Sequence, residues 1–207
     1  MPIKISLVDA GKRYNREWIF RHLTIELHQG EAYAITGPNG SGKSTLLQTI
    51  AGAVGLSEGK IHYNENETPV PEEAVFKKIS FAAPYLELVE EMTLNEFLSF
   101  HNNFKPFYPE VTAEAAAEMV GLTKAKDKQI AHFSSGMKQR LKLAQAFFSD
   151  TPVLMLDEPT ANLDAEGIAV YHLLVKEFRK DRIVIVSSND EQEYSFCNTI
   201  IQMADYK

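Results

Sequence analysis

Short apolar runs recur along the chain and predict the strands of a buried parallel sheet. The runs at 32–36, 153–156 and 183–186 contain almost no polar side chain. Continuous runs of four or five residues are typical of strands that are covered on both faces. Residues 78–82 and 200–203 carry weaker runs of the same kind and are predicted to form two further strands. The pattern therefore predicts an α/β fold built on a parallel sheet.

Two segments near the N-terminus alternate between apolar and polar residues instead. Residues 3–8 and 23–27 show this period of two, which indicates strands with one buried and one solvated face. Residues 59–63 add another strand, and the polar, proline-containing stretch at 65–73 is predicted to be a loop. We therefore expect an antiparallel sheet in addition to the parallel one.

Apolar residues spaced by three and four positions predict helices between the strands. The predicted helices cover residues 44–54, the segment after a capping box at Thr93 and Glu96, residues 112–120, the segment after a cap at Ser134 or Ser135, and residues 165–180. Gly121 is expected to end the third helix, because glycine readily takes the left-handed conformation that closes a helix C-terminus.

The connection between the strand at 32–36 and the first helix fits the phosphate-loop pattern G-x-x-x-x-G-K-[ST] at every fixed position. Glycines in such a loop lack Cβ, so successive backbone N–H groups can turn inward on a polyphosphate. Lys43 brings a positive charge to the β- and γ-phosphates, and the Ser44 hydroxyl is a ligand for Mg²⁺. The residues predicted to bind the nucleotide are Gly37, Pro38, Asn39, Gly40, Ser41, Gly42, Lys43, Ser44 and Thr45. A glycine-rich turn with a chance lysine is the alternative interpretation.

Two carboxylates follow the apolar run at 153–156. Asp157 and Glu158 stand where the predicted strand ends, and ligands of open α/β sheets bind at the carboxyl ends of strands. Asp157 is predicted to hold Mg²⁺, while Glu158 points to the other face and is predicted to polarise a water. An acidic pair at a turn is a weak signal alone, but it becomes a strong one in a chain that also carries a phosphate loop.

A third motif stands shortly before these carboxylates. Residues 133–140 read FSSGMKQR and resemble the signature L-S-G-G-Q-x-Q-R of ABC-type ATPases. Together with the phosphate loop, LDEP at 156–159 and ANLD at 161–164, the motif resembles the nucleotide-binding subunit of an ABC transporter. The resemblance covers nearly the whole chain, and the order and spacing of the motifs are more specific than any single motif.

The resemblance implies a fold and a reaction. The implied fold is a P-loop NTPase with a mixed parallel core sheet, an antiparallel β subdomain and an inserted helical subdomain at about 85–135. All of these parts belong to one ABC ATPase domain over residues 1–207. The implied reaction is hydrolysis of ATP with Mg²⁺. In this family the reaction powers a separately encoded transmembrane permease, so the chain is expected to be cytoplasmic and peripheral on the membrane.

The same resemblance implies further site residues and a partner chain. Tyr14 takes the place of the aromatic residue that stacks on adenine. In the family, the signature of one subunit closes on the phosphate loop of another, so Ser134 and Gly136 are expected to bind nucleotide in trans. We therefore expect a homodimer, or a heterodimer with another ABC ATPase subunit. Lys43 and Glu158 are expected to be catalytic.

The sequence departs from the family at accessory positions. Pro84 stands where the family has its Q-loop glutamine, and proline has no side-chain oxygen for Mg²⁺ or water. Asn189 stands where the family has its catalytic switch histidine. The asparagine amide can donate a hydrogen bond to a γ-phosphate, but it carries no titrating proton. The alternative interpretation of this segment is a simple turn. Ser135 and Met137 replace a glycine and a glutamine of the signature. We expect ATP hydrolysis to be retained, at a rate that the lost contacts could reduce.

Composition and charge limit other functions. The chain of 207 residues is long enough for a substantial core. Its formal net charge of −7 does not favour binding to the negatively charged backbone of nucleic acid. No apolar run approaches the roughly 20 residues that span a bilayer, and no secretory signal is visible. The single cysteine, Cys197, excludes an internal disulfide and is predicted to be a small buried apolar residue in a reducing compartment.

Two other functions stay open on the sequence alone. One is a soluble ABC-type regulatory ATPase, and the other is a nucleotide-binding module that dimerises with ATP but barely hydrolyses it. The transported substrate cannot be deduced, because in this family the permease selects it.

Overall fold

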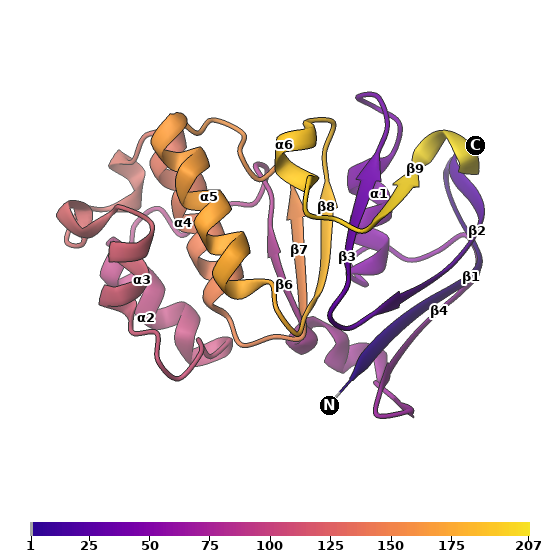
Figure 1. Cartoon of the computed structure of the whole chain (residues 1–207), viewed down its shortest axis with the longest axis horizontal. Helices are drawn as coiled ribbons and strands as arrows, with labels where there is room; N and C mark the ends of the chain where they lie inside the picture. Colours follow the sequence, from indigo (N-terminus) through magenta and orange to yellow (C-terminus); the bar gives the residue numbers. More distant parts are fainter. Residues whose placement is uncertain (1) are drawn as a thin grey trace.

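A five-stranded parallel sheet forms the centre of the computed structural model, which describes residues 2–207 (Figure 1). Its strand order is β6-β7-β8-β3-β9, and all of its pairings are parallel. The strands are β3 (Ala32–Thr36), β6 (Ile79–Ala82), β7 (Val153–Asp157), β8 (Ile183–Ser187) and β9 (Thr199–Gln202). The apolar runs of the sequence coincide with these strands, so the predicted parallel core is confirmed.

A second, antiparallel sheet has the order β2-β1-β4-β5. Its strands are β1 (Ile3–Tyr14), β2 (Glu17–His28), β4 (Glu58–Glu65) and β5 (Thr68–Pro69). β1 and β2 are much longer than the predicted segments, because the register shifts between Leu7 and Ala10 and Asp9 has a positive φ of 47°. Such bulges interrupt the alternation of apolar and polar residues on which the prediction depends. β5 falls inside the segment predicted to be a loop at 65–73 and corrects that prediction.

Helices cover both faces of the parallel sheet. They are α1 (Lys43–Ile50), α2 (Leu94–Phe104), α3 (Ala113–Met119), α4 (Ser135–Phe148), α5 (Ala165–Phe178) and α6 (Glu191–Tyr194), with 3₁₀ turns at Glu72–Lys78, Thr123–Ala125, Ile130–His132 and Met203–Tyr206. The predicted caps are confirmed: Thr93 and Glu96 form a capping box, and Ser134 caps α4. Gly121 has a φ of 71°, as expected for the residue that closes α3. Among the described helices, none combines the length and apolar character needed to cross a membrane.

Alternate residues of β7 face two different hydrophobic clusters. Leu154 and Leu156 join the cluster that α2, α3, α4 and α5 cover. Val153 and Met155 join the other cluster, which lies between the parallel sheet, α1 and the antiparallel sheet (Figure 1). Because side chains alternate along a strand, Asp157 continues the row of Val153 and Met155 and emerges on the α1 side. The fold thus directs this carboxylate toward the helix that follows the phosphate loop.

Arg182 is buried just before β8, with only 1% of its surface exposed. Its Nη2 donates to the hydroxyls of Ser80 and Thr151, at 2.8 Å in each case. Its Nη1 donates to the Phe147 carbonyl at the end of α4, at 2.9 Å. Burial lowers the pKa of the guanidinium to about 10, so the group stays charged at neutral pH. Arg182 therefore links the C-terminus of α4 to the parallel sheet. A cation at this end of a helix also interacts favourably with the helix dipole.

Candidate functional site

The phosphate-loop residues form the tight connection between β3 and α1. Gly37, Gly40 and Gly42 have φ angles of 146°, 78° and 103°, a region that glycine occupies without strain. A Cβ on Gly42 would stand 2.2 Å from Cγ2 of Ile19 on β2, so the loop has no room for a larger residue there. α1 begins at Lys43 without a side-chain cap, which leaves backbone N–H groups of its first turn free for an anion.

The Lys43 side chain lies over this loop. The residue is only 5% exposed, and its Nζ donates to the Gly37 carbonyl at 2.8 Å. The Pro38 carbonyl lies 3.5 Å from the same Nζ. A nearly buried cation at the start of α1 is arranged to receive phosphate oxygens.

Asp157 ends β7 as a buried carboxylate. Only 2% of the residue is exposed, and neither carboxylate oxygen has a hydrogen-bond partner within residues 2–207. A buried charge without a partner is costly, so this carboxylate fits a cation. α1 packs against β7, and Ser44 in the first turn of α1 supplies a second oxygen of the kind that Mg²⁺ prefers. The residues present therefore fit a magnesium site.

Glu158 follows Asp157 in an unusual backbone conformation. It is exposed and has a φ of 42°, a left-handed value that is uncommon for a residue with a side chain. Two hydrogen bonds hold it: its N–H donates to the Ser187 carbonyl at 2.9 Å, and its carbonyl accepts from the Ala161 N–H at 3.1 Å. Strained backbones of this kind cluster at functional sites, where the surrounding structure maintains them.

Asn189 lies against the phosphate loop, although it is far from it in sequence. Its Oδ1 accepts from the Gly37 N–H at 3.3 Å, and its Nδ2 donates to Oδ1 of Asn39 at 3.1 Å. The side chain reaches this place from the segment that follows β8. An amide group therefore stands beside the loop, in the residue that the family resemblance assigned to the switch position.

The signature residues lie on the other side of the parallel sheet from α1 (Figure 1). The Oγ of Ser134 accepts from the Met137 N–H at 3.2 Å, and a Cβ on Gly136 would stand 3.0 Å from the Asn162 carbonyl. These residues line a hollow of about 440 Å³ together with Arg140. Within one chain, the structure does not bring Ser134 and Gly136 to the phosphate loop.

Tyr14 ends β1, at the turn of the long hairpin. It is 48% exposed, and the Lys12 Nζ lies 5.0 Å from the centroid of its ring. The paired strand β2 brings Ile19 against Gly42, so this hairpin borders the phosphate loop. An exposed aromatic face is thus available beside the candidate site.

The segment after β6 contains a residue that the sequence did not reveal. Pro84 and Tyr85 form a turn in which the Leu86 N–H donates to the Ala83 carbonyl at 3.2 Å. Burial raises the pKa of the Tyr85 phenol to about 12; a hydrogen bond with Gln48 opposes the rise, and the Asp157 carboxylate adds to it. Tyr85 is 48% exposed and follows Pro84 at the edge of the sheet where β7 ends in Asp157. No sequence motif marks it, because a tyrosine after a proline is an ordinary turn residue.

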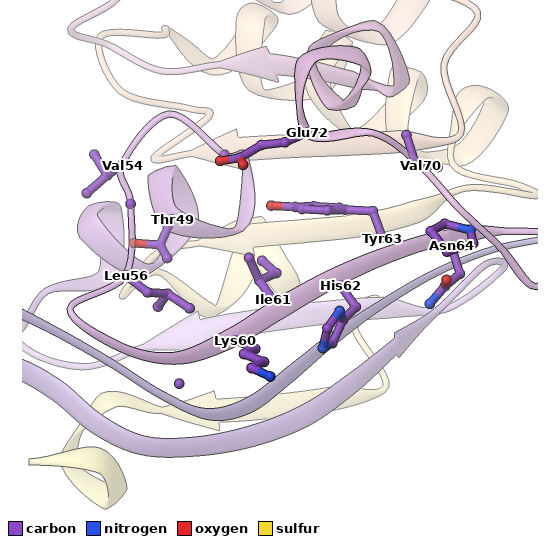
Figure 2. A pocket seen from close by; sticks show the side chains of 14 residues that line it. Thr49, Val54, Leu56, Lys60, Ile61, His62, Tyr63, Asn64, Val70 and Glu72 are labelled. Atoms are coloured by element: carbon purple, nitrogen blue, oxygen red, sulfur yellow. The ribbon is translucent and has the colours of Figure 1, made fainter.

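Another hollow, of about 370 Å³, lies between the C-terminal end of α1 and β4 (Figure 2). The Tyr63 hydroxyl there donates to the Ile50 carbonyl at 3.0 Å, and the Thr49 hydroxyl donates to the Thr45 carbonyl at 2.8 Å. Both hydroxyls are therefore engaged by the helix. The hollow is at the opposite end of α1 from the phosphate loop and takes no part in the candidate site.

Comparisons with known proteins agree with the motifs. A family model described as ABC transporter matches residues 20–161. The matched range includes the phosphate loop, the signature and both carboxylates, whereas Tyr14 and Asn189 lie outside it.

Individual relatives extend the similarity over most of the chain. A cytochrome c biogenesis ATP-binding export protein of Xylella fastidiosa (strain 9a5c) is 37% identical over 154 residues, which cover 73% of this chain and 68% of that protein. An uncharacterized ABC transporter ATP-binding protein of Bacillus subtilis (strain 168) is 30% identical over 207 residues, and the aligned region covers 96% of this chain and 92% of that protein. The solved structure of a putative ABC transporter ATP-binding protein from Pyrococcus furiosus superposes with a TM-score of 0.82 at 24% identity, over 99% of both chains.

Proposed function

The chain belongs to the ABC transporter ATP-binding proteins, and from this premise we propose that it binds MgATP at the phosphate loop and hydrolyses it to drive a separately encoded membrane permease. The observation that carries the proposal is the buried Asp157 carboxylate, which has no hydrogen-bond partner within residues 2–207 and faces the α1 side of the sheet. Because permeases of this family cross the membrane, the chain would act as a cytoplasmic, peripheral subunit. The transported substrate would be selected by the permease.

Each site residue has a role in this proposal. The backbone amides of the loop and Lys43 bind the β- and γ-phosphates. Ser44 and Asp157 hold Mg²⁺, which when bound neutralises charge on the phosphate oxygens. Glu158 polarises the attacking water, and Tyr14 stacks on adenine. Asn189 donates a hydrogen bond to the γ-phosphate from the position it holds beside Gly37.

The domain organisation belongs to the same proposal. Residues 1–207 form a single ABC ATPase domain, in which about 85–135 are the helical subdomain. The helices α2 and α3 share a hydrophobic cluster with α4 and α5, which supports one continuous unit with an inserted helical part.

ATP is expected to bring two chains together head to tail. The family resemblance implies that Ser134 and Gly136 complete the site, and because the signature lies across the sheet from the phosphate loop, they would have to come from a second subunit. Slowing hydrolysis should trap this state, and Glu158→Gln with saturating MgATP is expected to elute as a dimer on a sizing column. The same variant without nucleotide, and wild type with ADP, are the controls and should be monomeric. A variant that stays monomeric with ATP bound would contradict the homodimer and leave a different ABC ATPase subunit as the required partner.

Asn189 allows a test of the switch position. Asn189→His is expected to raise the hydrolysis rate, by less than about tenfold, since neutral histidine offers one donor much as asparagine does. The gain should depend on pH near the ordinary histidine pKa of about 6.5, because the protonated ring has two donors and a positive charge. Steady-state ATPase rates across pH ~6–8 would measure it. A neutral or harmful effect at every pH would show that the site is adapted to asparagine.

A further inference from the structure

We propose that Glu193 is a positioning residue for ATP hydrolysis: its buried carboxylate holds the segment that follows Glu158 and thereby fixes where the Glu158 side chain points. The inference rests on the proposed role of Glu158 in polarising water and adds to it a residue of α6. The contact that carries it joins Glu193 to Thr160, which lies 33 positions earlier in the chain.

The Glu193 carboxylate binds both hydrogen-bond donors of Thr160. Its Oε1 accepts from the Thr160 N–H at 2.7 Å and also from the Thr160 hydroxyl. Glu193 is only 3% exposed, and no lysine, arginine or histidine within residues 2–207 forms an ion pair with it. A buried carboxylate without a cation is costly, so it depends on hydrogen-bond donors in its place. Thr160 is therefore held strongly at this point.

Thr160 lies two residues after Glu158, in a short segment that is held from two helices. Glu193 holds Thr160 from α6, and the Gln139 side chain holds the preceding residue from α4, donating to the Pro159 carbonyl at 2.8 Å. Glu158 itself has the left-handed φ of 42°. Such a conformation persists only when the surrounding structure maintains it. The contact between Glu193 and Thr160 is one of the restraints that can do so.

The position of Glu193 is fixed in turn. Its N–H donates to the Asp190 carbonyl at 3.0 Å, and its own carbonyl accepts from the hydroxyl of Tyr171, a fully buried residue of α5, at 2.5 Å. The same short segment includes Asn189, which contacts the phosphate loop. One segment after β8 thus contacts the phosphate loop at its start and the residues following Glu158 at its end.

Loss of the carboxylate should affect turnover more than nucleotide binding. Without it, the Thr160 donors lose their acceptor, and the segment can relax away from the left-handed geometry of Glu158. Misplacing a catalytic group by about 1 Å can lower a rate by about 10²-fold. ATP binding uses the phosphate loop and Lys43, which do not depend on where the Glu158 side chain points.

Glu193→Ala is expected to lower kcat for ATP hydrolysis about tenfold or more, while calorimetry gives an unchanged dissociation constant for MgATP. Glu193→Gln keeps an acceptor oxygen for the same two donors and should recover most of the rate. Glu191→Ala is the matched control, because it removes an exposed carboxylate from the same helix, and it should hydrolyse ATP as wild type does.

The decisive comparison uses the Glu158→Gln background. If Glu193 acts through the Glu158 carboxylate, adding Glu193→Ala to Glu158→Gln should change single-turnover phosphate release by less than about twofold, whereas a general loss of structure would lower it again. If Glu193→Ala did not fold, Thr160→Val, which removes only the hydroxyl donor, would take its place with the same expected pattern.

Two results would overturn the inference: an unchanged kcat in the variant, or a further loss of the same size in the Glu158→Gln background. If the wild-type chain itself did not hydrolyse MgATP, the proposed function would fail instead.

Discussion

Replacing Lys43 with alanine is expected to abolish MgATP binding or to weaken it by orders of magnitude. The ammonium is nearly buried over the loop and is the positive side chain that faces the phosphate site from α1. Charge-assisted hydrogen bonds to phosphate are roughly twice as strong as neutral ones, and the substitution removes the positive charge that Lys43 contributes. Titration calorimetry of both proteins with MgATP would measure the difference.

A matched variant guards against a general effect of losing a lysine. Lys78→Ala removes an ammonium that pairs with Glu65 at 2.8 Å, in a segment away from the phosphate loop. This variant should bind MgATP as wild type does. Unchanged affinity in Lys43→Ala, with the fold intact by circular dichroism, would mean that nucleotide does not bind at this loop.

Replacing Glu158 with glutamine should lower the rate of ATP hydrolysis by about 10²-fold or more, the usual size of a general-base contribution. Glutamine has nearly the same shape and keeps the hydrogen bonds that the backbone of Glu158 makes to Ser187 and Ala161. It cannot accept a proton from water, so binding should survive while turnover falls. Phosphate release and calorimetry on the same preparation would separate these two quantities. Glu177→Gln, an exposed carboxylate on α5, is the control and should be fully active.

Local sequence signals predicted much of the fold because they depend on neighbouring residues alone. The strand at 32–36 coincides with β3, and the capping box at Thr93 marks the start of α2. Gly121 was predicted to close α3 because a left-handed residue is needed there. The predicted helix at 44–54 extends too far, since α1 ends at Ile50 and the chain turns through Gly52, whose φ is 74°.

Features that depend on contacts between distant parts of the chain could not be predicted from the sequence. Arg182 has no local mark of burial, because its acceptors come from α4 and from the segments around β6 and β7. The contact of Asn189 with Gly37 joins residues 152 positions apart and was approached only through the family resemblance. The resemblance marks Pro84 as the family's glutamine position and gives no information about its neighbour Tyr85. The catalytic and nucleotide-binding roles of the site residues stay predictions.

Phosphate release from MgATP by the purified wild-type chain tests the central claim most directly. The measurement would run with Mg²⁺, with EDTA, and with Glu158→Gln in parallel. We predict release that requires Mg²⁺ and falls by about 10²-fold or more in the variant. Release that is equal in EDTA, or a Glu158→Gln variant as active as wild type, would contradict the catalytic site described for this chain.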